Sequence, residues 1–167
     1  TGLVINAPEI REPMGLFGHV SNGVIRNVVI ESCDINALDS AGAVAGKVIV
    51  SNDKNEAYVA DCYATGKIKG SSFLGGIAGS SSKVMRCGFS GDVIGEQDTL
   101  FEQTSYGVGG VAGDAVLVEN CFARGNVSGY RYAGGVVGQG RRVFDSYFIG
   151  ALEGVETVGG VVGSCAV

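Results

Sequence analysis

The apolar residues of this chain recur at alternate positions, in short runs that glycines separate. The runs are rich in Val and Ile, and no stretch of useful length has the i, i+3, i+4, i+7 spacing of an amphipathic helix. Alternation with a period of two, bounded by glycine, is typical of β-strands that bury one face. The sequence therefore predicts an all-β protein.

The strand pattern repeats around a glycine-rich phrase such as Gly75-Gly76-Ile77-Ala78-Gly79. The glycines that close the copies are Gly18, Gly46, Gly79, Gly113, Gly138 and Gly163. The last three lie 25 residues apart, which sets the basic unit. Self-similarity at such a period indicates a solenoid, in which each repeat buries its apolar face on its neighbours. We expect a parallel β-helix of about five to six coils, right-handed as parallel crossovers nearly always are, with the closing glycines in structural roles.

A second repeated block has the form Val-x-x-Cys-x-x-x-Gly-x-Val-x-Gly and aligns side chains into columns. Two columns are expected to point inward: Val59, Val84, Val118 and Val143 form the first, and Ile68, Val93, Val127 and Leu152 form the second. Between them, the pairs Tyr63/Ala64, Gly88/Phe89 and Phe122/Ala123 alternate large and small residues. We interpret this alternation as volume compensation within one packed interior.

Three of the five cysteines, Cys62, Cys87 and Cys121, share a column in which Ser146 takes the fourth place. Adjacent strands lie about 4.8 Å apart, which is longer than the ~3.8 Å between Cβ atoms that a disulfide prefers. We therefore expect buried free thiols with a structural role. A straight row of sulfurs also fits tetrahedral metal coordination poorly, so we expect no metal and no cofactor.

Two repeats carry insertions, which in solenoids emerge as surface loops and often lie on a binding face. The first covers residues 48–56 and lacks the interior glycine and oxygen spacing of a calcium loop. The second covers residues 96–104 and places two large apolar residues among acids. Its candidate ligand-binding residues are Glu96, Asp98, Leu100, Phe101 and Glu102. The alternatives are that Phe101 folds back over the coil and that both insertions are tolerated bulges.

Length and repetition predict one solenoid domain over residues 1–167, which we expect to be a fragment of a larger protein. Residues 1–13 would form a partial coil or cap, 14–163 the repeats, and 164–167 the start of a further coil. Open strand edges at the two ends could pair end to end. The net charge of −5, with no basic stretch, argues against nucleic-acid binding. No run is long enough to span a membrane, so we expect no membrane insertion.

Little in the sequence points to catalysis. The column that holds Asp61, Arg86, Asn120 and Asp145 separates its acids by two rungs or more, which favours a surface ion pair between Asp61 and Arg86 over clustered catalytic carboxylates. The single histidine, His19, has no triad motif beside it, and a His-Glu-x-x-His pair is absent.

The phrase Gly15-Leu16-Phe17-Gly18, its Gly-Gly-Val-Val-Gly descendants and the block described above resemble the GLUG repeat of bacterial surface proteins, over residues 14–163. Leu16 and Ala43 depart from the pattern at its second glycine. The resemblance implies a location outside the cell or on its surface, as in adhesin-like proteins and the non-catalytic regions of immunoglobulin A-cleaving metallopeptidases. We therefore expect a non-enzymatic structural or adhesive segment that binds a host glycan or an extracellular protein. The alternatives are a carbohydrate-active β-helix enzyme and the substrate-recognition region of a surface peptidase.

Overall fold

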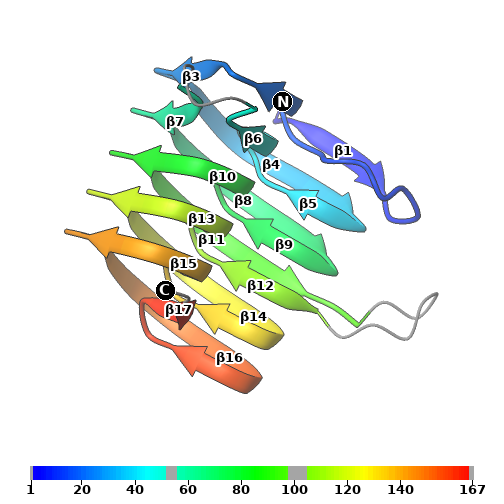
Figure 1. Cartoon of the computed structure of the whole chain (residues 1–167). Helices are drawn as coiled ribbons and strands as arrows, with labels where there is room; N and C mark the ends of the chain where they lie inside the picture. The colour runs from blue at the N-terminus through cyan, green and yellow to red at the C-terminus, as the bar shows by residue number, and fades with distance from the viewer. Residues whose placement is uncertain (1, 52–55, 98–104, 166–167) are drawn as a thin grey trace.

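The computed structural model describes residues 2–51, 56–97 and 105–165, and within these residues every element is a β-strand (Figure 1). The strands pair in parallel in two sheets. The first sheet holds β1 (Val4–Ala7), β4 (Val29–Ala37), β5 (Asp39–Ala41), β8 (Tyr63–Gly70), β9 (Ser72–Gly75), β11 (Gly88–Gly95), β12 (Tyr106–Gly109), β14 (Phe122–Gly134) and β16 (Tyr147–Gly159). The second holds β2 (Phe17–Ser21), β3 (Val24–Arg26), β6 (Ala45–Ile49), β7 (Tyr58–Ala60), β10 (Ala78–Met85), β13 (Ala112–Glu119), β15 (Val137–Phe144) and β17 (Val162–Cys165).

The first sheet is strongly curled, because the long strand β14 pairs with β11 along one part and with β12 along another. We call it the curled sheet. The chain alternates between the curled sheet and the second sheet, with one or two consecutive strands in each, so that successive passes stack as rungs (Figure 1). This arrangement of parallel strands is consistent with a parallel β-helix, and the prediction of an all-β parallel architecture is confirmed.

The two inward columns are also confirmed. Val84 pairs in register with Val59 and Val118, and Val93 pairs in register with Ile68 and Val127. All of these side chains are buried in one continuous core. The register is the same on every rung because a shift of one residue between paired strands would turn the apolar side chains from the core to the outer face.

The predicted volume compensation is wrong in one respect, because two adjacent residues of a strand face opposite sides of the sheet. Ala64 and Phe89 are buried in the core, whereas Tyr63 lies at the surface and is only partly buried. The ring of Phe89 is instead accommodated from across the core, where a Cβ atom on Gly76 would overlap it. The large Phe89 side chain is therefore compensated by the missing side chain of Gly76, the second glycine of the repeated glycine-rich phrase.

The closing glycines bring the two sheets into backbone contact. A Cβ atom on Gly113 would lie 2.5 Å from the amide nitrogen of Leu74, and one on Gly138 would lie 2.5 Å from that of Val108. Neither glycine has a positive φ, so the requirement is for space rather than for an unusual backbone conformation. At Gly113 and Gly138 a side chain would therefore collide with the backbone of the facing sheet.

The boundaries of the first insertion differ from the prediction. Val48 lies in β6, is fully buried and pairs with Val20 and Ser81. Its side chain fills the core, so the extra residues begin only after β6. The second insertion connects β11 to β12, as expected, and Glu96 and Gln97 at its start are exposed. Across the described residues we find no helix with the length and hydrophobicity needed to cross a membrane.

Candidate functional site

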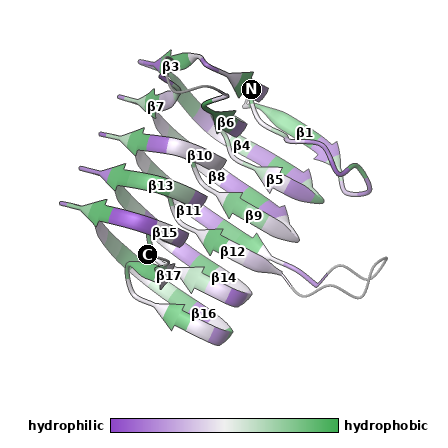
Figure 2. Cartoon of the chain, in the orientation of Figure 1, coloured by the Kyte–Doolittle hydropathy of each residue, from purple (hydrophilic) through white to green (hydrophobic). Residues whose placement is uncertain are grey.

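The chain turns from the second sheet into the curled sheet through one polar residue on each rung. We call these residues the polar column: Asp61, Arg86, Asn120 and Asp145. Each adopts a left-handed conformation, with φ between 46° and 54°, which Asn and Asp tolerate better than other non-glycine residues. Figure 2 shows the resulting hydrophilic turns after β7, β10, β13 and β15, each beside an apolar strand end.

Asp61 is held between two arginines on neighbouring rungs. Arg86 donates from Nε to Asp61 Oδ1 at 2.6 Å and from Nη2 to Oδ2 at 2.9 Å, and Arg26 Nη2 lies 3.3 Å from Oδ2. The predicted pair between Asp61 and Arg86 is confirmed, whereas the contact of Arg26 was not predicted. These hydrogen bonds, first that of Arg86, lower the pKa of the Asp61 carboxyl below its ordinary value. Asp61 is therefore a fixed anion at neutral pH.

The cysteine column lies directly behind these turns and consists of buried free thiols, as predicted. Cys87 donates from Sγ to the carbonyl oxygen of Met85 at 3.2 Å, and Cys121 donates to that of Glu119 at 3.2 Å. Ser146 makes the same bond to the residue two before it, which explains why serine can occupy this column. Hydrogen bonding with Cys121 and Cys62, together with burial, raises the pKa of Cys87, so this thiol stays protonated.

Three aromatic rings lie on the outer side of the curled sheet, beside the polar column. We call them the aromatic ladder: Tyr63, Phe122 and Tyr147. The ring centroids of Tyr63 and Phe122 are 6.1 Å apart, and those of Phe122 and Tyr147 are 5.7 Å apart. Gly88 occupies the rung between Tyr63 and Phe122 and leaves room for them to approach, because a Cβ atom there would overlap the Phe122 ring.

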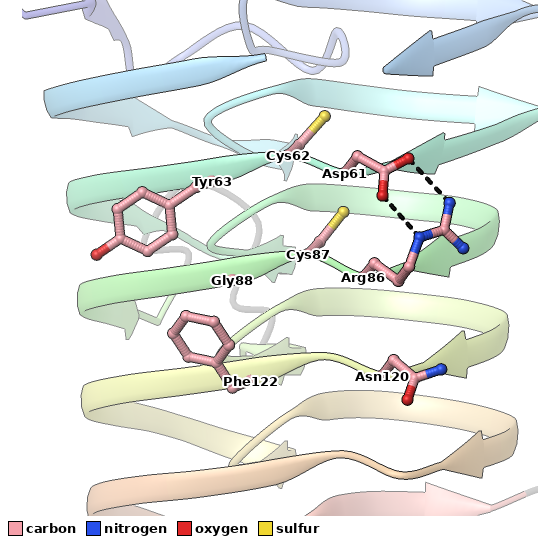
Figure 3. A pocket seen from close by; sticks show the side chains of 8 residues that line it. All are labelled: Asp61, Cys62, Tyr63, Arg86, Cys87, Gly88, Asn120 and Phe122. Carbon is pink, nitrogen blue, oxygen red and sulfur yellow. Dashed lines mark hydrogen bonds and ion pairs between the residues drawn. The ribbon is translucent and has the colours of Figure 1, made fainter. Parts of the chain in front are cut away.

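An open pocket of about 340 Å³ lies between the polar column and the aromatic ladder. Its lining residues are Asp61, Cys62, Tyr63, Arg86, Cys87, Gly88, Asn120 and Phe122. Figure 3 shows the two rings at one end and the ion pair at the other, with the cysteines between them. The pocket thus offers apolar surface at one end and hydrogen-bonding groups at the other, which is the usual composition of a small-ligand site.

Of the predicted ligand-binding residues, the structure describes Glu96, and this residue does not line the pocket. Glu96 is exposed at the end of β11, where its carboxylate lies 3.0 Å from Lys69 Nζ. The other four candidates, Asp98, Leu100, Phe101 and Glu102, lie outside the described residues. A second pocket of about 370 Å³ lies at the base of this insertion, and Gln97, Ser105 and Tyr130 are among its lining residues.

Sequence reasoning missed the pocket because it assigned Tyr63 and Phe122 to the interior. The useful signal was a glycine, Gly88, in the same column as two aromatic residues, next to a column of charged and amide side chains. Among the residues that the structure describes, no group of three or more His, Cys, Asp or Glu side chains is arranged to hold a metal ion.

Comparisons of the chain with family models, with curated proteins and with solved structures give no match. The resemblance to the GLUG repeat therefore rests on the repeated residues of this sequence, and the function has to be argued from the geometry of the site.

Proposed function

We propose that this chain is a non-catalytic structural or adhesive segment of a bacterial protein that is secreted or displayed on the cell surface. In this proposal it is a right-handed parallel β-helix of about five to six coils of ~25 residues, related to GLUG repeats. Its outer face and its second insertion would bind host glycans or extracellular proteins. The segment would act by holding binding groups in fixed positions, with no chemical step.

The observation that carries the proposal is the open pocket between the aromatic ladder and the polar column. The rings of Tyr63 and Phe122 stand on strands that are fixed by in-register pairing and by a continuous buried core, and the turn residues Asp61 and Arg86 hold each other in an ion pair. Because these side chains are already ordered, a ligand that binds them causes little further loss of conformational entropy. A prearranged surface of this kind suits recognition.

The state of Asp61 supports a binding role over catalysis. A general acid works best when its pKa lies near the working pH, but Arg86 and Arg26 hold the Asp61 carboxyl in its ionised form. Both oxygens are occupied by guanidinium donors, so the carboxylate is suited to orienting Arg86 rather than to transferring a proton. Weak binding by one such face becomes effective when many copies act together, as on a cell surface.

The test is a binding screen of the chain against glycans and extracellular-matrix proteins, beside a variant that lacks residues 96–104. The deletion is structurally matched, because it leaves Gly95 followed by Ser105 and Tyr106, the same length as the uninterrupted segment Gly129–Arg131 in β14. Specific binding by the full chain supports an adhesive role, and its loss on deletion places that role in the insertion. If neither protein binds any ligand, the adhesive proposal fails and a spacer function remains.

A further inference from the structure

We propose that the aromatic ladder and the polar column together bind an uncharged, unbranched glycan whose sugar rings lie along the axis of the stack. This inference rests on the proposed adhesive function and names the ligand class and the site. It places recognition of the glycan on the face around Gly88.

The aromatic ladder provides apolar surface in a row along the stack. Tyr63, Phe122 and Tyr147 follow one another along the stack, with centroid separations of 6.1 Å and 5.7 Å. A pyranose ring has an apolar C–H face and a rim of hydroxyl groups, so it can pack against an aromatic side chain while its rim stays hydrated or hydrogen-bonded. A linear saccharide repeats such rings at a similar step, which matches a row better than a single ring would.

The rings of the aromatic ladder are held in place by polar contacts on their own face. Tyr63 Oη donates to Ser90 Oγ at 3.1 Å, and the guanidinium carbon of Arg124 lies 5.5 Å from the centroid of Phe122. Tyr147 stacks on Phe122 with an angle of 13° between the ring planes. These contacts limit rotation of the rings before a ligand arrives.

The polar column supplies the hydrogen bonds that sugar hydroxyls need. Arg86 directs two of its N–H groups to Asp61, and a guanidinium has five. Asn120 is exposed at the edge of the pocket and carries both a carbonyl acceptor and an amide donor. A hydroxyl group donates and accepts, so it can bond to both kinds of group in this wall.

The charge of the wall favours a neutral ligand. Arg26, Arg86 and Arg124 carry three positive charges, and Asp61 and Asp145 carry two negative charges, so the polar column and the aromatic ladder together have a net charge of only +1. A polyanionic glycan or a nucleic acid would need an excess of cations along its path. The pocket at Gly88 is large enough for a small ring, and Tyr147 extends the surface by one rung towards the end of the stack.

The test measures binding of the full chain to an array of neutral and acidic oligosaccharides, followed by titration of the best neutral ligand at lengths of one to six sugars. We expect a neutral linear glycan to bind, with affinity that rises until about three sugars are present. Phe122→Ala and Tyr147→Ala should each weaken binding by about tenfold. Phe144→Ala is the matched control, since this aromatic residue is 51% exposed on β15 and does not line the pocket, and it should change nothing.

Three results overturn the inference: a preference for acidic glycans, unchanged affinity in both Phe122→Ala and Tyr147→Ala, or no binding of any neutral glycan at millimolar concentration. Tyr147 is 46% exposed, so its truncation keeps the test meaningful if the Phe122 variant folds poorly. If deletion of residues 96–104 abolishes binding while both aromatic variants retain it, this inference fails and the proposed adhesive function stands. If no ligand of any class binds, both fail.

Discussion

Replacement of Gly113 by alanine tests whether the closing glycines hold the two sheets together. Gly113 is buried in β13, and a Cβ atom there would overlap the carbonyl carbon of Phe73 and lie 2.5 Å from the amide nitrogen of Leu74. Both atoms belong to the backbone of β9, which cannot rotate away as a side chain can. We therefore expect the two sheets to be forced apart locally.

The magnitude follows from two opposing effects. Overpacking of a well-packed interior costs about 1–3 kcal/mol, and contact with backbone places Gly113→Ala at the upper end of that range. Reduced entropy of the unfolded chain returns about 0.4–1 kcal/mol when glycine becomes alanine. Gly160 is the matched control, because a Cβ atom there would have no neighbour within 4 Å. Gly160→Ala should be neutral or slightly stabilising, and Gly113→Ala should lower the free energy of unfolding by about 2 kcal/mol.

Urea unfolding followed by circular dichroism measures both variants, and hydrogen exchange of β9 and β13 shows whether the loss is local. Since repeat proteins can unfold in parts, the amide protection of the two strands is the more direct readout. Equal stabilities for Gly113→Ala and Gly160→Ala, with unchanged protection in β9, would refute the argument that the closing glycines are required for sheet-to-sheet contact.

Two further predictions concern the turn that carries the site. Cys121→Ser should lower the free energy of unfolding by less than about 1 kcal/mol, because Ser146 already makes the equivalent hydrogen bond. Cys121→Val should lower it by about 1–3 kcal/mol in urea unfolding, because the amide of Cys87 loses its acceptor. Equal losses in the two variants would contradict the role of the hydrogen bond. Asp61→Asn should remove the stabilisation that the ionised Asp61 carboxylate gives to the folded state. This stabilisation is fully present above the ordinary carboxyl pKa of 3.8, and it is lost as the pH falls through the lowered pKa of the folded state. The stabilities of the two proteins should therefore converge in acid, and a difference that grows as the pH falls would show that the sign is wrong.

The stacked core could be predicted from the sequence because every rung repeats the same requirement. Val59, Val84 and Val118 occupy one place in the repeat, and parallel pairing of identical phases turns that place into a buried column. The left-handed conformations of Phe73 within β9 and Tyr132 within β14, with φ of 49° and 56°, could not be predicted in this way. Large side chains disfavour that conformation, so stacking against the neighbouring rungs overrides the local preference.

The ion pair of the site was accessible to sequence reasoning, whereas the pocket was not. Asp61 and Arg86 share a column, and rung spacing alone brings their side chains within reach. The pocket depends on which of two adjacent residues faces outward. A pair such as Gly88 and Phe89 gives the same alternation of large and small residues whether Gly88 or Phe89 faces the core. In the structure Phe89 lies against Gly76 across the core, so Phe89 faces inward and Gly88 faces outward. The sequence alone does not show which residues face each other across the core.

Gly88 is a residue that the pocket requires and that the fold does not. Glycine within a strand lowers stability by about 0.5–1 kcal/mol relative to alanine, and the φ of Gly88 is not in the left-handed region that would demand it. The equivalent residues on the neighbouring rungs, Tyr63 and Phe122, show that the backbone accepts large side chains at this position. What Gly88 provides is the space into which the Phe122 ring leans and beside which the pocket opens. Since the inward column remains intact behind it, the choice of glycine is explained by the surface it creates and not by the core.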